Sequence, residues 1–321
     1  MFNSFSKIMY LCVVFYFFGI SSSYSQALVS AEWLEKNICK ENLIVLEVHT
    51  GKRSYEASHI PCSVYTNFYE SGWRVKEKNI PLMLPSVEHL KTVLQDHGIS
   101  NDDKVIVVAS GRGEYSMAET TSIYFTLKYI GHNDISILDG GAPAWFENWD
   151  RDSETGYKKQ KKSIFHPRVN NDIIANKEDV LLGLNNKIDI IDGRSSDFYM
   201  GINNTDPSLR YGTIAGAKNI PNQWLLKNGS LYFHKKENLE KIINNQGIDF
   251  NKPQISFCNA GLESSIVWFA LSEILKNSKS KLYESSLAEW SKDKSLPMES
   301  FINIENGNID ELQNDYSMEP N

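Results

Sequence analysis

The feature that most limits the fold is an ordered set of strand and helix patterns that occurs twice, once in each half of the chain. The apolar runs of the first half are 43–48, 105–108 and 135–138, and those of the second half are 188–192, 255–257 and 281–283. Their length and their Val and Ile content predict strands, and a helical pattern follows the second run of each half. Strands that alternate with helices predict a parallel sheet covered on both faces, so the fold class is α/β.

Two pairs of positions define the offset between the halves. Glu47 and Asp192 lie 145 positions apart, and Trp145 and Trp290 are separated by the same number. Equal offsets near both ends of the pattern predict a duplicated domain. With 321 residues, of which 41% are hydrophobic, the chain is long enough for two globular domains, each with its own core.

Composition and the repeat together predict five segments. They are a signal peptide over 1–25, a first domain over 26–150, a linker over 151–170, a catalytic domain over 171–300 and a polar acidic tail over 301–321. The linker is recognised by its run of charged residues between Trp149 and Pro167.

The N-terminus has the pattern of an export signal. Lys7 precedes an apolar stretch over 8–20, which is shorter than the ~20 residues that a membrane-spanning helix needs. We therefore expect cleavage near Ser25, export to the periplasm or the medium, and no stable membrane anchor.

Cys258 is the strongest candidate for a nucleophile. It follows the strand that ends at Phe257, and a glycine and an apolar helix come after it. Unpaired amides at a helix N-terminus stabilise a thiolate, so this position favours the reactive form of the side chain. The first half has Ala109 and Ser110 at the corresponding place, so we expect no covalent sulfur chemistry there. The sequence leaves open whether Cys39 and Cys62 form a disulfide.

A series of short motifs points to a known family. They are His59-Ile60-Pro61, Leu138-Asp139-Gly140-Gly141 with Trp145, Ile191-Asp192-Gly193-Arg194-Ser195, Gly212-Thr213-Ile214-Ala215-Gly216-Ala217, the Cys258 loop, and Tyr283-Glu284-Ser285 with Glu289-Trp290. In order and spacing, this set resembles the tandem-domain rhodanese family, the thiosulfate and 3-mercaptopyruvate sulfurtransferases. The resemblance implies two tandem rhodanese-like domains, each a mainly parallel sheet flanked by helices.

The resemblance also implies a reaction. Cys258 would take the outer sulfur of thiosulfate or 3-mercaptopyruvate as a persulfide and pass it to a thiol or to cyanide, with no metal or organic cofactor. We expect a monomer whose partners are only this small-molecule donor and acceptor. Backbone N–H groups at a helix N-terminus would stabilise the thiolate and the persulfide. The residues of this expected cradle are Asn259, Ala260, Gly261, Leu262, Glu263 and Ser264.

Several positions differ from the family pattern. Asn259 and Ala260 are neutral, as in members that use 3-mercaptopyruvate, whereas Glu263 stands where the family has a threonine. A carboxylate there opposes a dianionic donor unless it points into solvent. Arg210 is the candidate for a substrate-binding arginine.

Asp192 and Arg194 follow a strand directly, and two roles are open for them. They either contact the substrate or form a structural ion pair that braces neighbouring loops. His59 is expected to hydrogen-bond within a turn rather than to catalyse. Thr213 stands where the second domain of the family has a histidine.

Other classes of function have less support. The net charge of −7 argues against general nucleic-acid binding, and the seven histidines lack metal-ligand spacing. A phosphatase of the Cys-x5-Arg type needs an arginine where this chain has Ser264. The remaining alternative is a non-catalytic or weakly catalytic exported sulfur-carrier protein with the same fold.

Overall fold

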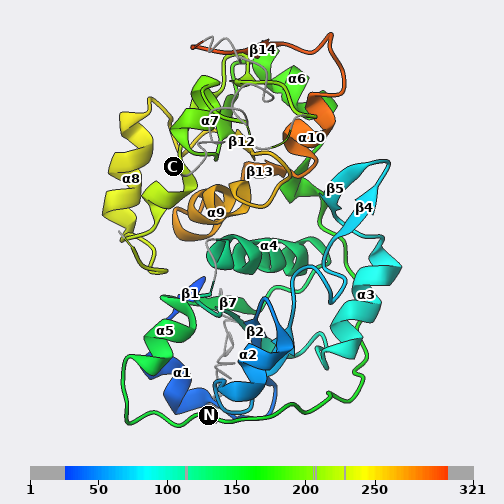
Figure 1. The fold of residues 1–321 in the computed structure, drawn as a ribbon, viewed down its shortest axis with the longest axis vertical. Coiled ribbons are helices and arrows are strands. Elements are labelled where there is room, and N and C mark those ends of the chain that lie inside the picture. Colours follow the sequence, from blue (N-terminus) through cyan, green and yellow to red (C-terminus); the bar gives the residue numbers. More distant parts are fainter. Residues whose placement is uncertain (1–25, 113–114, 205, 207, 228, 303–321) are drawn as a thin grey trace, which may run out of the picture.

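The computed structural model describes residues 26–112, 115–204, 206, 208–227 and 229–302. The expected signal peptide and nearly all of the expected acidic tail lie outside these residues. The described chain forms two α/β halves that are stacked along the long axis of the molecule (Figure 1). Within the described residues, no helix has the length and apolar character that crossing a bilayer requires.

The first half contains a sheet of five parallel strands in the order β1-β7-β6-β2-β3 (Figure 1). These strands are β1 (Leu28–Val29), β2 (Leu43–Val48), β3 (Val64–Thr66), β6 (Lys104–Ala109) and β7 (Ile135–Leu138). The three runs predicted from the sequence are the three central strands. Along β6, Val105 and Val107 face one hydrophobic cluster and Ile106 and Val108 face another, as the two-residue period of a strand requires.

Helices cover both faces of this sheet. They are α1 (Ala31–Asn37), α2 (Lys52–Ala57), α3 (Val87–Asp96), α4 (Ser116–Tyr129) and α5 (Gly141–Phe146). Helix α4 lies on the face toward the second half, whereas α1 and α5 pack on the opposite face (Figure 1). An antiparallel hairpin of β4 (Val75–Glu77) and β5 (Ile80–Met83) extends toward the second half.

The second half repeats this topology. Its parallel sheet has the order β8-β13-β12-β9-β11, which corresponds strand by strand to the first sheet. The strands are β8 (Ile174–Ala175), β9 (Asp189–Asp192), β11 (Lys218–Asn219), β12 (Gln254–Phe257) and β13 (Ser280–Tyr283). The duplication predicted from the 145-residue offset is therefore present in the fold.

The helices of the second half are α6 (Lys177–Asn185), α7 (Ser196–Met200), α8 (Lys236–Asn245), α9 (Ser264–Phe269) and α10 (Ser286–Trp290). A π-helical turn over Ala270–Ile274 continues α9. Short 3-10 turns occupy Asn171–Ile173 and Asn222–Leu225, and β10 (Thr213–Ile214) pairs antiparallel with β14 (Met298–Glu299).

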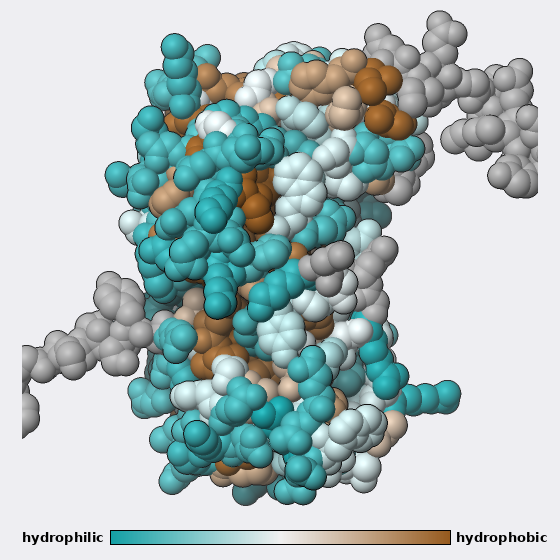
Figure 2. All heavy atoms as spheres, turned by 90° about the vertical axis from the view of Figure 1, so that its left-hand side faces the viewer, coloured by the Kyte–Doolittle hydropathy of each residue, from teal (hydrophilic) through white to brown (hydrophobic). Residues whose placement is uncertain are grey.

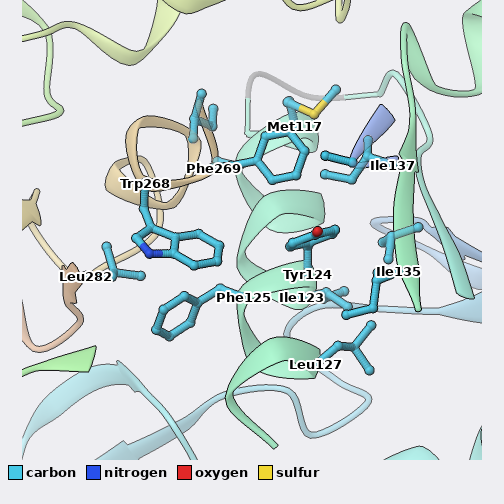
Figure 3. Close-up of a cluster of buried hydrophobic side chains, with 14 of the residues drawn as sticks. Met117, Ile123, Tyr124, Phe125, Leu127, Ile135, Ile137, Trp268, Phe269 and Leu282 are labelled. Atoms are coloured by element: carbon cyan, nitrogen blue, oxygen red, sulfur yellow. The ribbon is translucent and has the colours of Figure 1, made fainter. Parts of the chain in front are cut away.

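The two halves share one hydrophobic cluster, and each half also has a buried cluster of its own, as expected for two domains. Figure 3 shows Trp268 and Phe269 of α9 packed against Tyr124 and Phe125 of α4. The rings of Phe125 and Trp268 lie 4.8 Å apart in a T-shaped arrangement, and those of Tyr124 and Phe269 lie 4.9 Å apart. Residues 116–127 of α4 are all buried, because this helix is enclosed by its own sheet on one side and by α9 on the other.

The corresponding tryptophans confirm the repeat in detail. Trp145 and Trp290 are both buried, and each indole Nε1 donates to the carbonyl oxygen seven residues further along the chain, that of Asp152 or Pro297, at 3.0 and 3.1 Å. Each side chain thus anchors the segment that leaves its domain.

The expected linker follows the surface of the first half. Glu154 forms a two-way backbone bridge with His59, at 2.9 Å in each direction, and Arg168 N donates to Ile130 O at 2.9 Å. Beside it, Cys39 and Cys62 form a disulfide with a Cα–Cα distance of 5.4 Å, which answers the question that the sequence left open.

Candidate active site

Cys258 follows β12 at the carboxyl edge of the second sheet and is the one free cysteine of the described chain. Parallel strands present their carboxyl ends at one edge, so the loops after β12 and β13 meet there. Cys258 O accepts a hydrogen bond from Leu287 N at 3.2 Å, and Asn259 O accepts one from Ala288 N at 2.9 Å. The nucleophile loop is therefore held by the segment after β13.

Gly261 allows this loop to turn. Its φ of +73° lies in the left-handed region, and a Cβ atom on it would lie 2.6 Å from Glu284 O and 2.7 Å from Glu284 Cγ. Any other residue would meet backbone strain and a clash together. Gly261 thus lets the Cys258 loop pack directly on the loop after β13.

Ser286, two residues after Glu284, also holds this loop. Its side chain is fully buried, and its Oγ accepts hydrogen bonds from Cys258 N and Gly261 N, both at 3.1 Å, while donating to Tyr283 O at 2.7 Å. Sequence reasoning included the neighbouring Tyr283-Glu284-Ser285 in a motif but missed this residue as a site residue. The available signal was its position after β13, beside the strand that bears the nucleophile.

The expected amide cradle is realised in part. The backbone N–H groups of Ala260 and Ser264 bond to the Cys258 sulfur. The Gly261 amide points instead to Ser286, so it is not a sulfur ligand in this structure. The carbonyl oxygens of Asn259, Leu262 and Glu263 fix the loop, since they accept hydrogen bonds from Ala288 N, Ser265 N and Ile266 N.

The environment raises the pKa of the Cys258 thiol above its ordinary value. Burial is the largest cause, because Cys258 is 1% exposed, and the Glu263 carboxylate raises the pKa further. The hydroxyl and amide of Ser264 and the amide of Ala260 act in the opposite direction without reversing the shift. The expectation that this position favours the thiolate was therefore wrong for the structure as it stands, because burial was not foreseen.

Asp192 and Arg194 form the loop-bracing ion pair that the sequence left as one of two possibilities. Arg194 Nη2 lies 2.6 Å from Asp192 Oδ2 and 2.7 Å from Gly212 O, and its Nη1 donates to Asn259 Oδ1 at 3.2 Å. Thr213 Oγ1 donates to Asp192 Oδ2 at 2.8 Å, in the place of the expected histidine. The pair therefore connects β9 and the 212–213 turn to the nucleophile loop.

Arg210 does not lie at the sulfur. Its guanidinium donates to the carbonyl oxygens of Leu296, Trp290 and Asp293 at 3.0 to 3.3 Å, which secures the segment after α10. His59 likewise has a structural role, since its Nδ1 lies 2.9 Å from Tyr55 O and its ring stacks on Tyr55.

A buried ion pair joins the first half to the Cys258 loop. Arg74 Nε lies 2.9 Å from Glu284 Oε1. The two groups form an ion pair, but their geometry does not meet the criteria for a hydrogen bond. Both side chains are buried, and Arg74 also donates to Trp73 O, Thr126 Oγ1 and Ser122 O. Burial raises the pKa of Glu284 to about 7, although Arg74 opposes this shift. The sequence gave no sign of this pair, because its members are far apart in the chain.

Hollows occur between the halves on the face shown in Figure 2, where apolar atoms lie between hydrophilic surfaces. One cleft of about 740 Å³ is lined by Asp139 and Arg151 of the first half and by Lys227 and His234 of the second. Cys258 does not line this cleft or the neighbouring one of about 550 Å³. The described residues contain no group of three or more His, Cys, Asp or Glu side chains placed to hold a metal ion.

The structure contains two copies of a five-stranded parallel α/β unit, and the second copy has a free cysteine in the loop after one of its central strands. These features define a tandem-domain protein with a candidate sulfur nucleophile. Residues 30–148 match the family model of the rhodanese-like domain. The first half is thus similar to the rhodanese-like domain, and the chain as a whole is similar to proteins that are named as sulfurtransferases.

Similar proteins cover almost the whole chain. A protein of Mycolicibacterium smegmatis, provisionally named as a thiosulfate sulfurtransferase, is 28% identical over 283 residues, which are 86% of this chain and 98% of that protein. The 3-mercaptopyruvate sulfurtransferase of Escherichia coli is 27% identical over 282 residues, 84% of this chain and 97% of that protein. The crystal structure of SseA from Escherichia coli, described as a 3-mercaptopyruvate sulfotransferase, has a TM-score of 0.72 at 24% identity and covers 82% of this chain and 99% of that one.

Proposed function

We propose that this protein transfers a sulfane sulfur through a persulfide on Cys258. The observation that carries the proposal is the placement of the free Cys258 thiol at the carboxyl edge of β12 with two backbone amides on its sulfur. Amide donors that converge on a sulfur stabilise negative charge there without a metal ion.

In the first step, the Cys258 thiolate attacks the outer sulfur of the donor. A new S–S bond forms, the bond between that sulfur and the rest of the donor breaks, and its electron pair leaves with sulfite from thiosulfate or with the enolate of pyruvate from 3-mercaptopyruvate. In the second step, a thiolate or cyanide attacks the outer sulfur, and the electron pair of the S–S bond returns to Cys258. The cysteine is regenerated, and no external oxidant or reductant is consumed.

Neutral residues after the nucleophile favour 3-mercaptopyruvate over thiosulfate as the donor. Asn259 and Ala260 carry no charge, and Glu263 opposes a dianion near the sulfur. Arg194 and Arg210 are engaged with protein acceptors, so neither is held ready for a donor carboxylate. Because Cys258 is 1% exposed, neighbouring side chains must move before a donor reaches the sulfur.

The test is to incubate the protein with each donor and to weigh it by mass spectrometry. We expect a gain of about 32 Da on Cys258 and steady turnover when cyanide or a thiol is added. Cys258→Ser should fold normally and lose transfer, because a serine hydroxyl is far less ionised than a thiol. Transfer by Cys258→Ser at the wild-type rate would refute the assignment of the nucleophile.

The second candidate function is a sulfur carrier with little turnover. It is favoured by the raised pKa of the Cys258 thiol, since a protonated thiol is a poor nucleophile. Loading of one sulfur without release to thiols or cyanide would support the carrier, and steady turnover would exclude it.

We further propose that the protein is exported and acts as a monomer. The support is the pattern of residues 1–25 and the disulfide between Cys39 and Cys62, which suits an oxidising compartment. Sequencing the N-terminus of protein recovered from outside the cytoplasm tests the cleavage near Ser25, and sedimentation tests the monomer.

A further inference from the structure

The Cys39–Cys62 disulfide lies at the surface of the first half, beside a cavity. Both cysteines are exposed, and their Cα atoms lie 5.4 Å apart. Cys62 lines a cavity of about 570 Å³, whereas Cys39 does not. A disulfide reacts when a thiolate reaches one of its sulfur atoms, so this arrangement leaves the bond open to attack.

The cavity is formed by the turn that contains Cys62 and by the linker. The turn contributes His59 and Cys62, and the linker contributes residues 154–158. The two walls are joined, because His59 and Glu154 form a backbone bridge and Glu154 Oε2 accepts a hydrogen bond from Cys62 N at 3.0 Å. The volume lies in the range of cavities that hold small molecules. A small thiol therefore has a preformed space next to Cys62.

Both cysteines have backbone angles that residues other than glycine rarely adopt. The angle φ is +60° at Cys39 and +58° at Cys62, in the left-handed region. Cys39 directly follows Ile38, the C-cap of α1, at a position that glycine usually occupies. The disulfide thus connects two strained residues, and its opening allows both to relax. Disulfides that are strained or exposed are reduced more easily than others.

Other contacts hold the turn when the disulfide opens. Ile60 N donates to Glu47 Oε1 at 2.6 Å, and Glu47 is fully buried. The hydroxyl of Tyr55 donates to Ser63 O at 2.7 Å, and Ser63 N donates to Ile60 O at 3.1 Å. The cavity therefore keeps its walls, and the chain need not unfold for the disulfide to react.

We propose that the Cys39–Cys62 disulfide is a thiol-exchange site, at which a low-molecular-weight thiol enters this cavity and binds covalently to Cys62. The thiolate of the small molecule attacks Cys62 Sγ and forms a new S–S bond. The bond to Cys39 breaks, and its electron pair leaves with Cys39 Sγ, which takes up a proton from water. The number of S–S bonds is unchanged, so no oxidant is consumed. Attack by the Cys39 thiolate on Cys62 Sγ reverses the reaction and releases the small thiol.

The experiment adds reduced glutathione to the oxidised full chain at several pH values, stops the reaction with acid, and locates the adduct by mass spectrometry. We expect a gain of about 307 Da on Cys62, at a rate that rises about tenfold per pH unit below the pKa of the glutathione thiol. Urea below the unfolding transition should not change this rate, because the folded chain reacts.

Two pairs of variants serve as matched controls. Thr155→Trp fills the cavity and should slow the exchange several-fold, whereas Thr155→Ser should react at the wild-type rate. Cys39→Ser has no disulfide and should gain no mass, whereas Cys258→Ser keeps the disulfide and should exchange like the wild type.

Three results would overturn the proposal: no adduct in a large excess of glutathione, a first adduct on Cys39, or a rate that follows the unfolding transition in urea. An unchanged rate in Thr155→Trp would refute entry through the cavity. The proposed sulfur transfer is tested separately by sulfur loading of Cys258, so either proposal can fail without the other.

Discussion

Glu284 provides the sharpest test of how the two halves are coupled. Its pKa of about 7 lies above the ordinary value of 4.5 because the carboxyl group is buried. The native state therefore binds this proton more tightly than the unfolded chain does, so the stabilisation is complete below pH 4.5 and is lost as the pH rises through 7. The difference between the native and the ordinary pKa of Glu284 corresponds to about 3 kcal/mol of unfolding free energy. Glu284→Gln should remove this pH dependence.

The assay is urea denaturation of the wild-type protein and Glu284→Gln at pH 4.5, 6 and 8. We expect the stability of the wild type relative to the variant to fall by about 3 kcal/mol across this range. A constant difference would refute the reasoning, since it would mean that pairing with Arg74 fully offsets burial. Arg74→Met is the internal control: Arg74 lowers the pKa of Glu284, so its removal should move the loss of stability to higher pH.

Three further substitutions test the loop that bears the nucleophile. Gly261→Ala should cost at least 1–3 kcal/mol in urea denaturation and abolish sulfur transfer, because the added Cβ would lie 2.6 Å from Glu284 O at a φ of +73°; a fully active variant would contradict this geometry. Glu263→Thr should lower the apparent pKa of Cys258 in an alkylation profile and improve the apparent affinity for anionic donors, and an unchanged affinity would show that this carboxylate faces away from the donor. Ser286→Ala should cost about 1–3 kcal/mol, measured by thermal unfolding, because it leaves two enclosed amides without an acceptor; a loss within the error of the measurement would show that water replaces the hydroxyl.

The architecture was predictable because its signals are local. Each central strand is a run of Val, Ile and Leu that ends at a turn, and such runs need only their own residues to be recognised. The equal spacing of Glu47 from Asp192 and of Trp145 from Trp290 then predicted the duplication, which the matching strand orders confirm. Cys258 was placed correctly after its strand for the same reason.

The energetics of the site were not predictable, because they depend on contacts between distant segments. Arg74 and Glu284 belong to different halves, and nothing near either residue in the sequence indicates the other. The pKa of Cys258 depends on how deeply its loop is buried, and burial is a property of the assembled fold. Local patterns could point to a candidate nucleophile but not show how strongly its surroundings disfavour ionisation.

These contacts also show how the half without a candidate nucleophile supports the half that has one. Helix α4 covers the apolar face of α9, and α9 begins at Ser264, whose amide bonds to the Cys258 sulfur. Arg74 forms an ion pair with Glu284 and opposes the rise of its pKa, and the backbone of Glu284 packs on Gly261. Without the first half, α9 would expose Trp268 and Phe269 to water and the buried carboxylate would lose its cation, so the geometry of the sulfur site depends on both halves.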